Sequence, residues 1–223
     1  MKRLLTSIIT ACAVTALHAD DATDVRKAFD DYKAAILEQR GTEAAELVTR
    51  RTLEEYQKYR DWALFAPRIT VQELSLLNRF QVAIVRHRVP TELLQGMDGR
   101  MLFAYAVDHD WIGKNGVIRL SIGEVEIASG RATAVVVLGG NPTEMRFQFR
   151  KEEDKWRFDL VYLMQLSNTA LAQSIKAKGL SEDGVIFQLL ETVSGRKVDD
   201  SIWDPLAVRN QSSQPSRPDG PRD

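Results

Sequence analysis

The sequence has almost no cysteine and little histidine: one cysteine, Cys12, and three histidines among 223 residues. Cys12 lies in an apolar N-terminal segment, so the remainder of the chain has no residue for a disulfide, a thiol nucleophile or a cysteine-ligated zinc site. The chain also lacks an excess of charge, with 30 basic and 31 acidic residues. Stability must therefore come from packing, and the balanced charge argues against nucleic acid as a partner.

Long apolar runs are absent as well, since the apolar segment Leu4–Leu17 falls short of the ~20 residues that span a bilayer. This argues against an integral membrane span. The segment has the pattern of a secretory signal peptide, with Lys2 and Arg3 before it and the small residue Ala19 after it. We predict cleavage after Ala19 and export to the periplasm or the cell exterior.

A lipoprotein signal is the alternative for this segment, with Cys12 as the acylated first residue. The residues Ile9-Thr10-Ala11-Cys12 loosely fit that pattern, but the apolar run before Cys12 is short and continues beyond it. Soluble export is therefore favoured. Processing after Ala19 also removes two basic and no acidic residues, which makes the mature chain more acidic.

The stretch Val117–Leu163 has the pattern of four consecutive strands separated by turns. Apolar residues alternate with polar ones up to Ile122, and after Gly123 the apolar phase slips by one to Val125 and Ile127. Such a slip predicts a β-bulge. Turns are predicted over 129–131, 139–142 and 151–155, where glycine, proline or a run of charged residues interrupts the pattern.

The last hairpin has the clearest alternation of aromatic and polar residues. Phe147 and Phe149 alternate with arginine and glutamine, and Trp156, Phe158 and Leu160 continue the pattern after the turn. One face of this hairpin is therefore expected to be buried and the other exposed to solvent.

Helices are predicted on both sides of the sheet. Apolar spacing and capping residues place them at Asp24–Gln39, ended by Gly41, and at 42–48, 52–67, 70–90, 169–178 and 181–194. The apolar run 101–107 fits either a buried strand or a helix packed on the core, and a helix is favoured. Thr52 and Thr70 are the predicted N-caps of two of them, and Gly179 and Gly195 are predicted C-caps. Residues 202–206 are predicted to form an apolar anchor that docks on the body of the fold.

Amphipathic helices followed by an antiparallel meander resemble the NTF2-like superfamily, which includes SnoaL-like and ketosteroid-isomerase-like proteins. The resemblance spans Asp24–Leu163 and rests on three features: the Phe29/Tyr32 helix, the phase slip at Gly123 and the aromatic alternation of 147–160. It implies an α+β fold in which N-terminal helices pack on a curved antiparallel sheet to form a cone, with ligands entering the open end. Members of the superfamily include isomerases, dehydratases, cyclases, immunity proteins and non-catalytic modules, so the fold alone does not fix an activity.

Four regions are predicted along the chain. Residues 1–19 form the signal peptide, residues 20–166 the NTF2-like core, and residues 167–209 a helical C-terminal extension packed on the core. Residues 210–223 are rich in Ser, Pro, Asp and Arg and form a predicted disordered tail.

One short cluster combines the side chains that acid–base chemistry in a cone would use. Tyr105, Asp108, His109 and Trp111 are the candidate pocket residues, with Asp110 beside them. Asp108 or His109 would act as general base and Tyr105 as the donor to an oxyanion. A polar loop in which Trp111 packs into the core is the more common explanation of such a cluster.

Metal binding is not predicted, because Asp108-His109-Asp110 lacks the spacing of a metal motif. The predicted mature chain has one other histidine, His87. His87 is expected to end a helix between Arg86 and Arg88, where a cation suits the helix dipole. These two arginines offer a carboxylate or phosphate site, but are expected to be solvated.

The function predicted from these patterns is an exported, non-catalytic binding or interaction module, without a cofactor. One alternative is an isomerase-, dehydratase- or hydrolase-type enzyme acting on a small apolar molecule in the cone. A second is an immunity or assembly protein that binds another protein. Homodimerisation through the sheet is a further expectation, although Arg146, Gln148 and Arg150 give that face a polar character.

Overall fold

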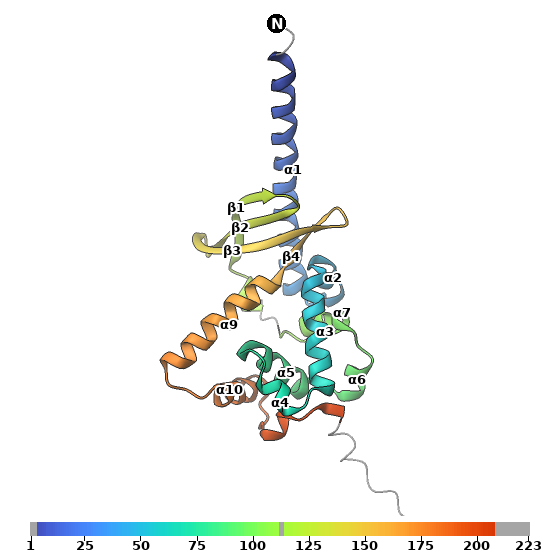
Figure 1. Ribbon diagram of the computed structural model, residues 1–223, viewed down its shortest axis with the longest axis vertical. Coiled ribbons are helices and arrows are strands. Elements are labelled where there is room, and N and C mark those ends of the chain that lie inside the picture. Colours follow the sequence, from blue (N-terminus) through green and yellow to red (C-terminus); the bar gives the residue numbers. More distant parts are fainter. Residues whose placement is uncertain (1–3, 112–113, 208–223) are drawn as a thin grey trace, which may run out of the picture. The chain divides into compact units, whose positions relative to one another are not determined.

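The computed structural model describes residues 4–111 and 114–207, and the side chains of 20–111, 114 and 116–207. Along the chain the elements are α1 (Leu4–Leu37), α2 (Gly41–Leu47), α3 (Arg50–Phe65), α4 (Arg68–Gln72), α5 (Leu76–Arg88), α6 (Thr91–Gln95), α7 (Gly99–Asp108), α8 (Lys114–Val117), β1 (Leu120–Ala128), β2 (Arg131–Leu138), β3 (Asn141–Glu152), β4 (Lys155–Asp159), α9 (Leu160–Ala177), α10 (Glu182–Ser194) and the 3-10 helix η1 (Asp200–Trp203) (Figure 1). Helices combined with one antiparallel sheet confirm the predicted α+β class.

The chain folds into two compact units. Unit 1 consists of Met1–Glu54 and Phe103–Leu163, and unit 2 of Glu55–Leu102 and Met164–Asp223. The chain passes between them within α3, α7 and α9. The described part of the predicted extension, from residue 167 onward, belongs to unit 2 together with 55–102, and the predicted tail lies outside the described residues.

The sheet of unit 1 is a four-stranded antiparallel meander in the order β1-β2-β3-β4, which confirms the four predicted strands. The pairing of β1 with β2 shifts between Ile122 and Val125, so the predicted bulge at Gly123 is confirmed. The turns are tighter than predicted. In each, two residues with positive φ connect the strands: Ser129–Gly130, Gly139–Gly140 and Glu153–Asp154. Two successive positive φ angles define the type I′ turn, whose twist matches that of the strands.

Helix α1 packs across one face of this sheet (Figure 1). Aromatic rings make this contact. The ring of Phe29 lies 5.4 Å from that of Phe147 and 5.8 Å from that of Phe158, and Tyr32 contacts Phe158 at 5.1 Å between centroids. All four side chains are buried. The predicted buried face of the last hairpin is therefore confirmed, and the space between α1 and the sheet is filled by aromatic side chains.

The predicted N-terminal residues of the mature chain lie where α1 meets this sheet. Asp21 accepts hydrogen bonds from Trp156 Nε1 and Lys151 Nζ, each at 2.9 Å. The bond to Asp21 raises the pKa of Lys151 above its usual value. The predicted cleavage point after Ala19 thus falls within α1, two residues before Asp21.

Two of the predicted element boundaries in unit 1 were wrong. Leu160, expected to continue the last strand, begins α9, because the carboxylate of Asp159 caps this helix by accepting a hydrogen bond from the Val161 N–H at 3.1 Å. Gly41, expected to end the first helix, begins α2 instead. A Cβ on Gly41 would lie 2.1 Å from the carbonyl oxygen of Ala104, so the close approach of α7, and not a left-handed turn, requires glycine there.

Two predicted helix starts were also displaced toward better caps. Helix α3 begins before Thr52, and Thr49 Oγ1 accepts the Thr52 N–H at 3.3 Å. The single helix predicted over 70–90 is divided into α4 and α5, with Ser75 as the N-cap of α5. Helix α7 confirms the helix predicted over 101–107. Gly195, with a φ of 66°, confirms the predicted C-cap of α10.

The apolar anchor predicted near the C-terminus is confirmed in unit 2. Trp203 in η1 is 1% exposed and stacks on Phe187 of α10 with ring centroids 5.8 Å apart. The guanidinium of Arg79 in α5 lies 5.4 Å from the Trp203 ring. Ile202 and Leu206, which lie near Trp203 in the sequence, are also buried. The segment therefore contributes to the core of unit 2.

A buried arginine connects three segments of unit 2. Arg86, expected to be solvated, is 4% exposed. Its guanidinium donates to the carbonyl oxygens of Trp62, Ala63 and Ala66 at the end of α3, at 2.9, 3.1 and 2.6 Å, and to that of Ile202 at 3.2 Å. A helix C-terminus leaves carbonyl groups such as those of Ala63 and Ala66 without intrahelical donors, and the Trp62 carbonyl also accepts the Ala66 N–H at 3.1 Å. Arg86 therefore closes α3 and fastens η1, which excludes it as an exposed anion site.

Replacing Arg86 by methionine is expected to destabilise the protein by about 3 kcal/mol or more, because several buried carbonyl groups lose their donor at roughly 1–3 kcal/mol each. Chemical denaturation followed by circular dichroism measures the change. Lys178→Met, which removes an exposed cation of the same unit, should change stability by less than about 0.5 kcal/mol. Equal effects of the two substitutions would contradict the role of Arg86.

Two buried tyrosines of α3 predict how stability depends on alkaline pH. Burial raises the pKa of Tyr56 and of Tyr59 above the ordinary value. Because the unfolded chain ionises these phenols near pH 10, their contribution is fully present below that pH and is lost as the pH rises above it. Absorbance titration should show these two of the five tyrosines ionising only as unfolding proceeds. Smooth ionisation of all five before unfolding would contradict this.

Candidate functional site

The cluster of candidate pocket residues lies at the end of α7 in unit 1 and is largely exposed. Tyr105 and Trp111 are half-buried, whereas Asp108 and His109 are exposed. The Tyr105 and His109 rings stack with centroids 3.8 Å apart, and Trp111 meets Tyr105 edge-on at 5.6 Å. The structure thus brings the aromatic residues and the imidazole together, on the surface.

The polar groups of this cluster are engaged in local structure. Asp108 Oδ1 accepts the backbone N–H of Gly41 at 2.7 Å, at the start of α2, where a carboxylate stabilises the helix terminus. His109 Nδ1 lies 2.8 Å from the carbonyl oxygen of Tyr105, one turn earlier in the same helix. Asp108 therefore joins α7 to α2, whereas Trp111, which the common explanation places in the core, is half-buried.

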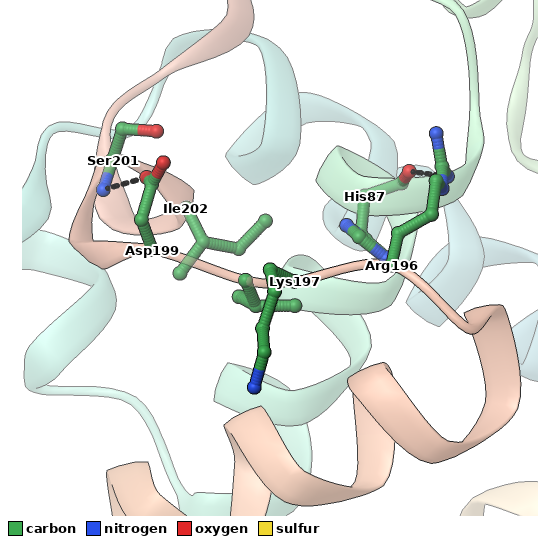
Figure 2. Close-up of a pocket in the computed structure, with 7 residues that line it drawn as sticks. His87, Arg196, Lys197, Asp199, Ser201 and Ile202 are labelled. Carbon is green, nitrogen blue, oxygen red and sulfur yellow. Dashed lines mark hydrogen bonds between the residues drawn. The ribbon is translucent and has the colours of Figure 1, made fainter.

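A pocket of about 230 Å³ lies in unit 2 beside the segment that joins α10 to η1 (Figure 2). His87 of α5 lies at one end and Ser201 at the other, as Figure 2 shows. The lining residues are His87, Arg196, Lys197, Val198, Asp199, Ser201 and Ile202. None of the predicted pocket residues of the α7 cluster is among them.

Hydrogen bonds within the protein engage much of this lining. Arg196 donates to the carbonyl oxygen of His87 at 2.8 Å, and His87 Nε2 lies 2.7 Å from Ser194 Oγ. Asp199 accepts the Ser201 N–H at 2.9 Å. The main effect of these contacts is to hold the 194–202 segment against α5.

Glu191 of α10 secures the middle of the same segment. Its carboxylate accepts the Val198 N–H at 3.1 Å and the Lys197 ammonium at 3.2 Å. These two contacts, the backbone one first, lower the pKa of Glu191. Lys197 is thus directed to α10, as its position in Figure 2 indicates, and away from the pocket residues Asp199 and Ser201.

The open face of the sheet in unit 1 carries a row of three arginines, opposite the face covered by α1. Arg131 of β2 pairs with Arg150 of β3, which pairs with Arg157 of β4. Like charges that face each other across strands are destabilising unless they are compensated. The effect of this row on the stability of the sheet therefore depends on which carboxylates lie beside each arginine.

Two of these arginines are compensated within unit 1. Arg150 Nε donates to Asp159 Oδ2 at 2.7 Å, and Arg157 lies within 3.5 Å of a Glu153 oxygen. Arg131 is exposed, and its side chain makes no hydrogen bond or ion pair with any described residue. Arg131 is thus a cation of this row left free for an outside partner.

The sequence patterns did not indicate the role of Asp159, the carboxylate that pairs with the arginine row. Its side chain is fully buried and accepts from Arg51 at 3.2 Å in addition to Arg150. It also caps α9, as described above. In the sequence it alternates with aromatic residues as an ordinary exposed strand position would. Its place directly before the apolar run of α9 is a helix-start signal that could have indicated the cap.

The described part of the chain has neither a metal-binding cluster nor a membrane-spanning helix. No group of three or more histidine, cysteine, aspartate or glutamate side chains in residues 20–111, 114 and 116–207 is arranged to hold a metal ion. Within the described part of the chain, no helix combines the length and apolar character needed to cross a membrane. Cys12, the residue of the lipoprotein alternative, lies outside the described side chains.

Comparisons of the chain with protein families, with curated proteins and with solved structures gave no match.

We predict that Asp108 is needed for stability and His109 is not. Asp108→Ala removes the acceptor for the Gly41 N–H and should destabilise the protein by about 1 kcal/mol, the usual effect of losing a cap. His109→Ala, at an exposed neighbouring position, should change stability by less than about 0.5 kcal/mol. Thermal unfolding of both variants provides the comparison, and an Asp108→Ala variant as stable as the wild type would contradict the capping role.

Proposed function

We propose that this chain is an exported, non-catalytic interaction module that binds an acidic protein partner through the open face of its sheet. The main support is Arg131. It stands in a row of three cross-strand arginines and, unlike the other two, pairs with no carboxylate of the described residues. A carboxylate from a partner would relieve the like-charge contact and give this face both affinity and orientation.

The remainder of that face suits a protein partner. Thr133 pairs with Gln148 beside the arginine row, and Val135 pairs with the exposed Arg146 one position further on. The polar side chains of Thr133, Gln148 and Arg146 thus lie around the small apolar side chain of Val135. Interfaces between separately folded proteins commonly combine polar contacts in this way.

We further propose that unit 1 is a form of the NTF2-like fold. Support comes from α1 packed across a four-stranded antiparallel meander and from the bulge at Gly123. In such a fold the interior of the cone would lie between α1 and the sheet. Near α1 this space is filled, since Phe29 and Tyr32 contact the aromatic rings of the sheet directly. A filled interior favours contact through the outer surface over a ligand within.

Contact through the face is also favoured because both sheet edges are engaged. On β1, the carbonyl oxygens of Leu120 and Gly123 accept from Lys33 at 2.7 Å and from Arg26 at 2.9 Å. On β4, the Phe158 carbonyl accepts the Thr49 N–H at 3.0 Å. Occupied edge groups restrict the addition of a strand from another chain. Homodimerisation by edge pairing is therefore less favoured than contact through the face.

Catalysis in unit 1 remains the alternative, with Asp108 or His109 as base and Tyr105 as donor. The bond from Gly41 to Asp108 weakens that alternative, since a base must be available to take a proton from a substrate. An immunity or assembly role would be one form of the proposed protein binding.

The proposal predicts that a charge reversal at Arg131 weakens the partner complex. Native mass spectrometry of the protein purified from its own exported fraction should show a second chain of defined mass. Arg131→Glu should weaken its binding by about tenfold or more, because like charges would then meet across the interface. Lys178→Glu makes the same charge change at an exposed site of unit 2 and should leave the complex intact.

Two results would contradict the proposal. One is a mature protein that carries no second chain. The other is a complex that Arg131→Glu and Lys178→Glu weaken equally. A bound small molecule whose turnover is lost in Asp108→Asn would favour the enzymatic alternative instead.

A further inference from the structure

The exposed large hydrophobic residues of unit 1 gather at one end of its sheet. Among the described residues of this unit they are Ile118, Leu138 and Met145, which are 56, 46 and 45% exposed. They come from the segment before β1, the end of β2 and the first part of β3. Three separate segments thus place apolar side chains at the same end, although solvent surrounds them.

Backbone contacts hold these three segments together. Leu138 pairs with Leu120, two residues after Ile118, and the Gly139 N–H donates to the Arg119 carbonyl at 2.9 Å. Between Val135 and Val137 the register of β2 with β3 shifts, so that β3 bulges over residues 143–145. Thr143 Oγ1 fixes this bulge by donating to the Val136 carbonyl at 2.8 Å. The apolar side chains are therefore carried by an ordered turn and bulge.

Two arginines flank the apolar residues and have no carboxylate partner among the described residues. The guanidinium of Arg119 lies over the turn, 3.0 Å from where a Cβ of Gly139 would be. Arg146 Nη1 donates to the carbonyl oxygens of Thr143, Glu144 and Met145 at 3.2–3.4 Å, and so remains on the bulge. We call Ile118, Arg119, Leu138, Met145 and Arg146 the sheet-end patch.

We propose that the sheet-end patch docks on the surface of an anionic lipid bilayer. Apolar side chains next to arginines form the pattern of interfacial membrane contacts, in which the apolar groups enter the headgroup region and the cations meet lipid phosphates. The apolar side chains of the patch are exposed at a turn and a bulge of the sheet end. A soft bilayer surface adapts to such a patch, whereas a protein partner would need a surface shaped to it.

This proposal rests on the export proposed above, which would bring the chain to the outer side of a membrane. A patch of this size gives reversible attachment, since stable anchoring commonly needs two signals. Arg131 lies at the opposite end of β2 from Leu138, whereas Arg146 belongs both to the patch and to the open sheet face. Substitutions at Arg131 and at the apolar patch residues therefore separate partner binding from lipid binding.

Co-sedimentation with lipid vesicles tests the proposal on the mature protein. Vesicles of phosphatidylethanolamine and phosphatidylglycerol should bind the protein, and vesicles of pure phosphatidylcholine should bind it much more weakly. The double variant Arg119→Gln/Arg146→Gln should bind anionic vesicles about 25-fold more weakly, at about fivefold for each arginine. Binding of the wild type should also fall as salt is added, because salt screens these charges.

Apolar variants supply the second arm of the experiment. Replacement of Ile118, Leu138 and Met145 by serine should lower vesicle binding by about tenfold or more. The matched control, Leu180→Ser/Val193→Ser, replaces exposed apolar residues of unit 2 and should bind like the wild type. Circular dichroism establishes whether each variant is folded, and the double arginine variant carries the test if the triple variant is not.

Three outcomes would overturn the lipid proposal. They are the absence of binding to anionic vesicles, equal binding to both kinds of vesicle, and equal loss in the unit 2 control. Capture of a second protein chain that depends on the patch, without vesicle binding, would also overturn it. Arg131→Glu separates the two proposals, because it should lose the protein partner and keep vesicle binding.

Discussion

The packing of α1 on one face of the sheet is the contact on which unit 1 depends. Phe29 and Tyr32 place their rings against Phe147 and Phe158, and these rings are removed from water together. Buried aromatic side chains dominate the stability of small cores. Because this contact fills the interior and closes one face, the opposite face and the sheet end are left to meet other molecules.

Buried charges have a structural role in both units. Arg86 in unit 2 donates to the carbonyl groups at the end of α3, and Asp159 in unit 1 accepts from Arg51, Arg150 and the start of α9. Each fixes the point at which one element gives way to the next. Removing one member of such a set leaves buried polar groups without partners, which is why these sites tolerate substitution poorly. Because the side chains of Arg86 and Asp159 are buried, neither is available to bind a ligand.

The surface of unit 1 thus separates into regions of different chemistry. Asp108 joins α7 to α2, Arg131 stands on the open face, and Ile118 and Arg119 lie at the sheet end. A partner recognised by charge and a bilayer recognised by charge with apolar contact would use different regions. An exported protein with both would hold its partner close to a membrane surface.

The sequence by itself determined the features that depend on neighbouring residues. Period-two alternation gave the strands, the slip at Gly123 gave the bulge, and Gly195 gave a helix end, because local sterics and pleat decide them. Tertiary contacts decided the rest. Gly41 is required by the approach of Ala104, Asp159 is buried by arginines on two other elements, and Arg86 is drawn inside by the carbonyl groups of α3. Ala104, Arg51 and the α3 carbonyl groups lie far along the chain from the residues that they contact, so no local pattern records them. The arginine row likewise arises only when three strands pair.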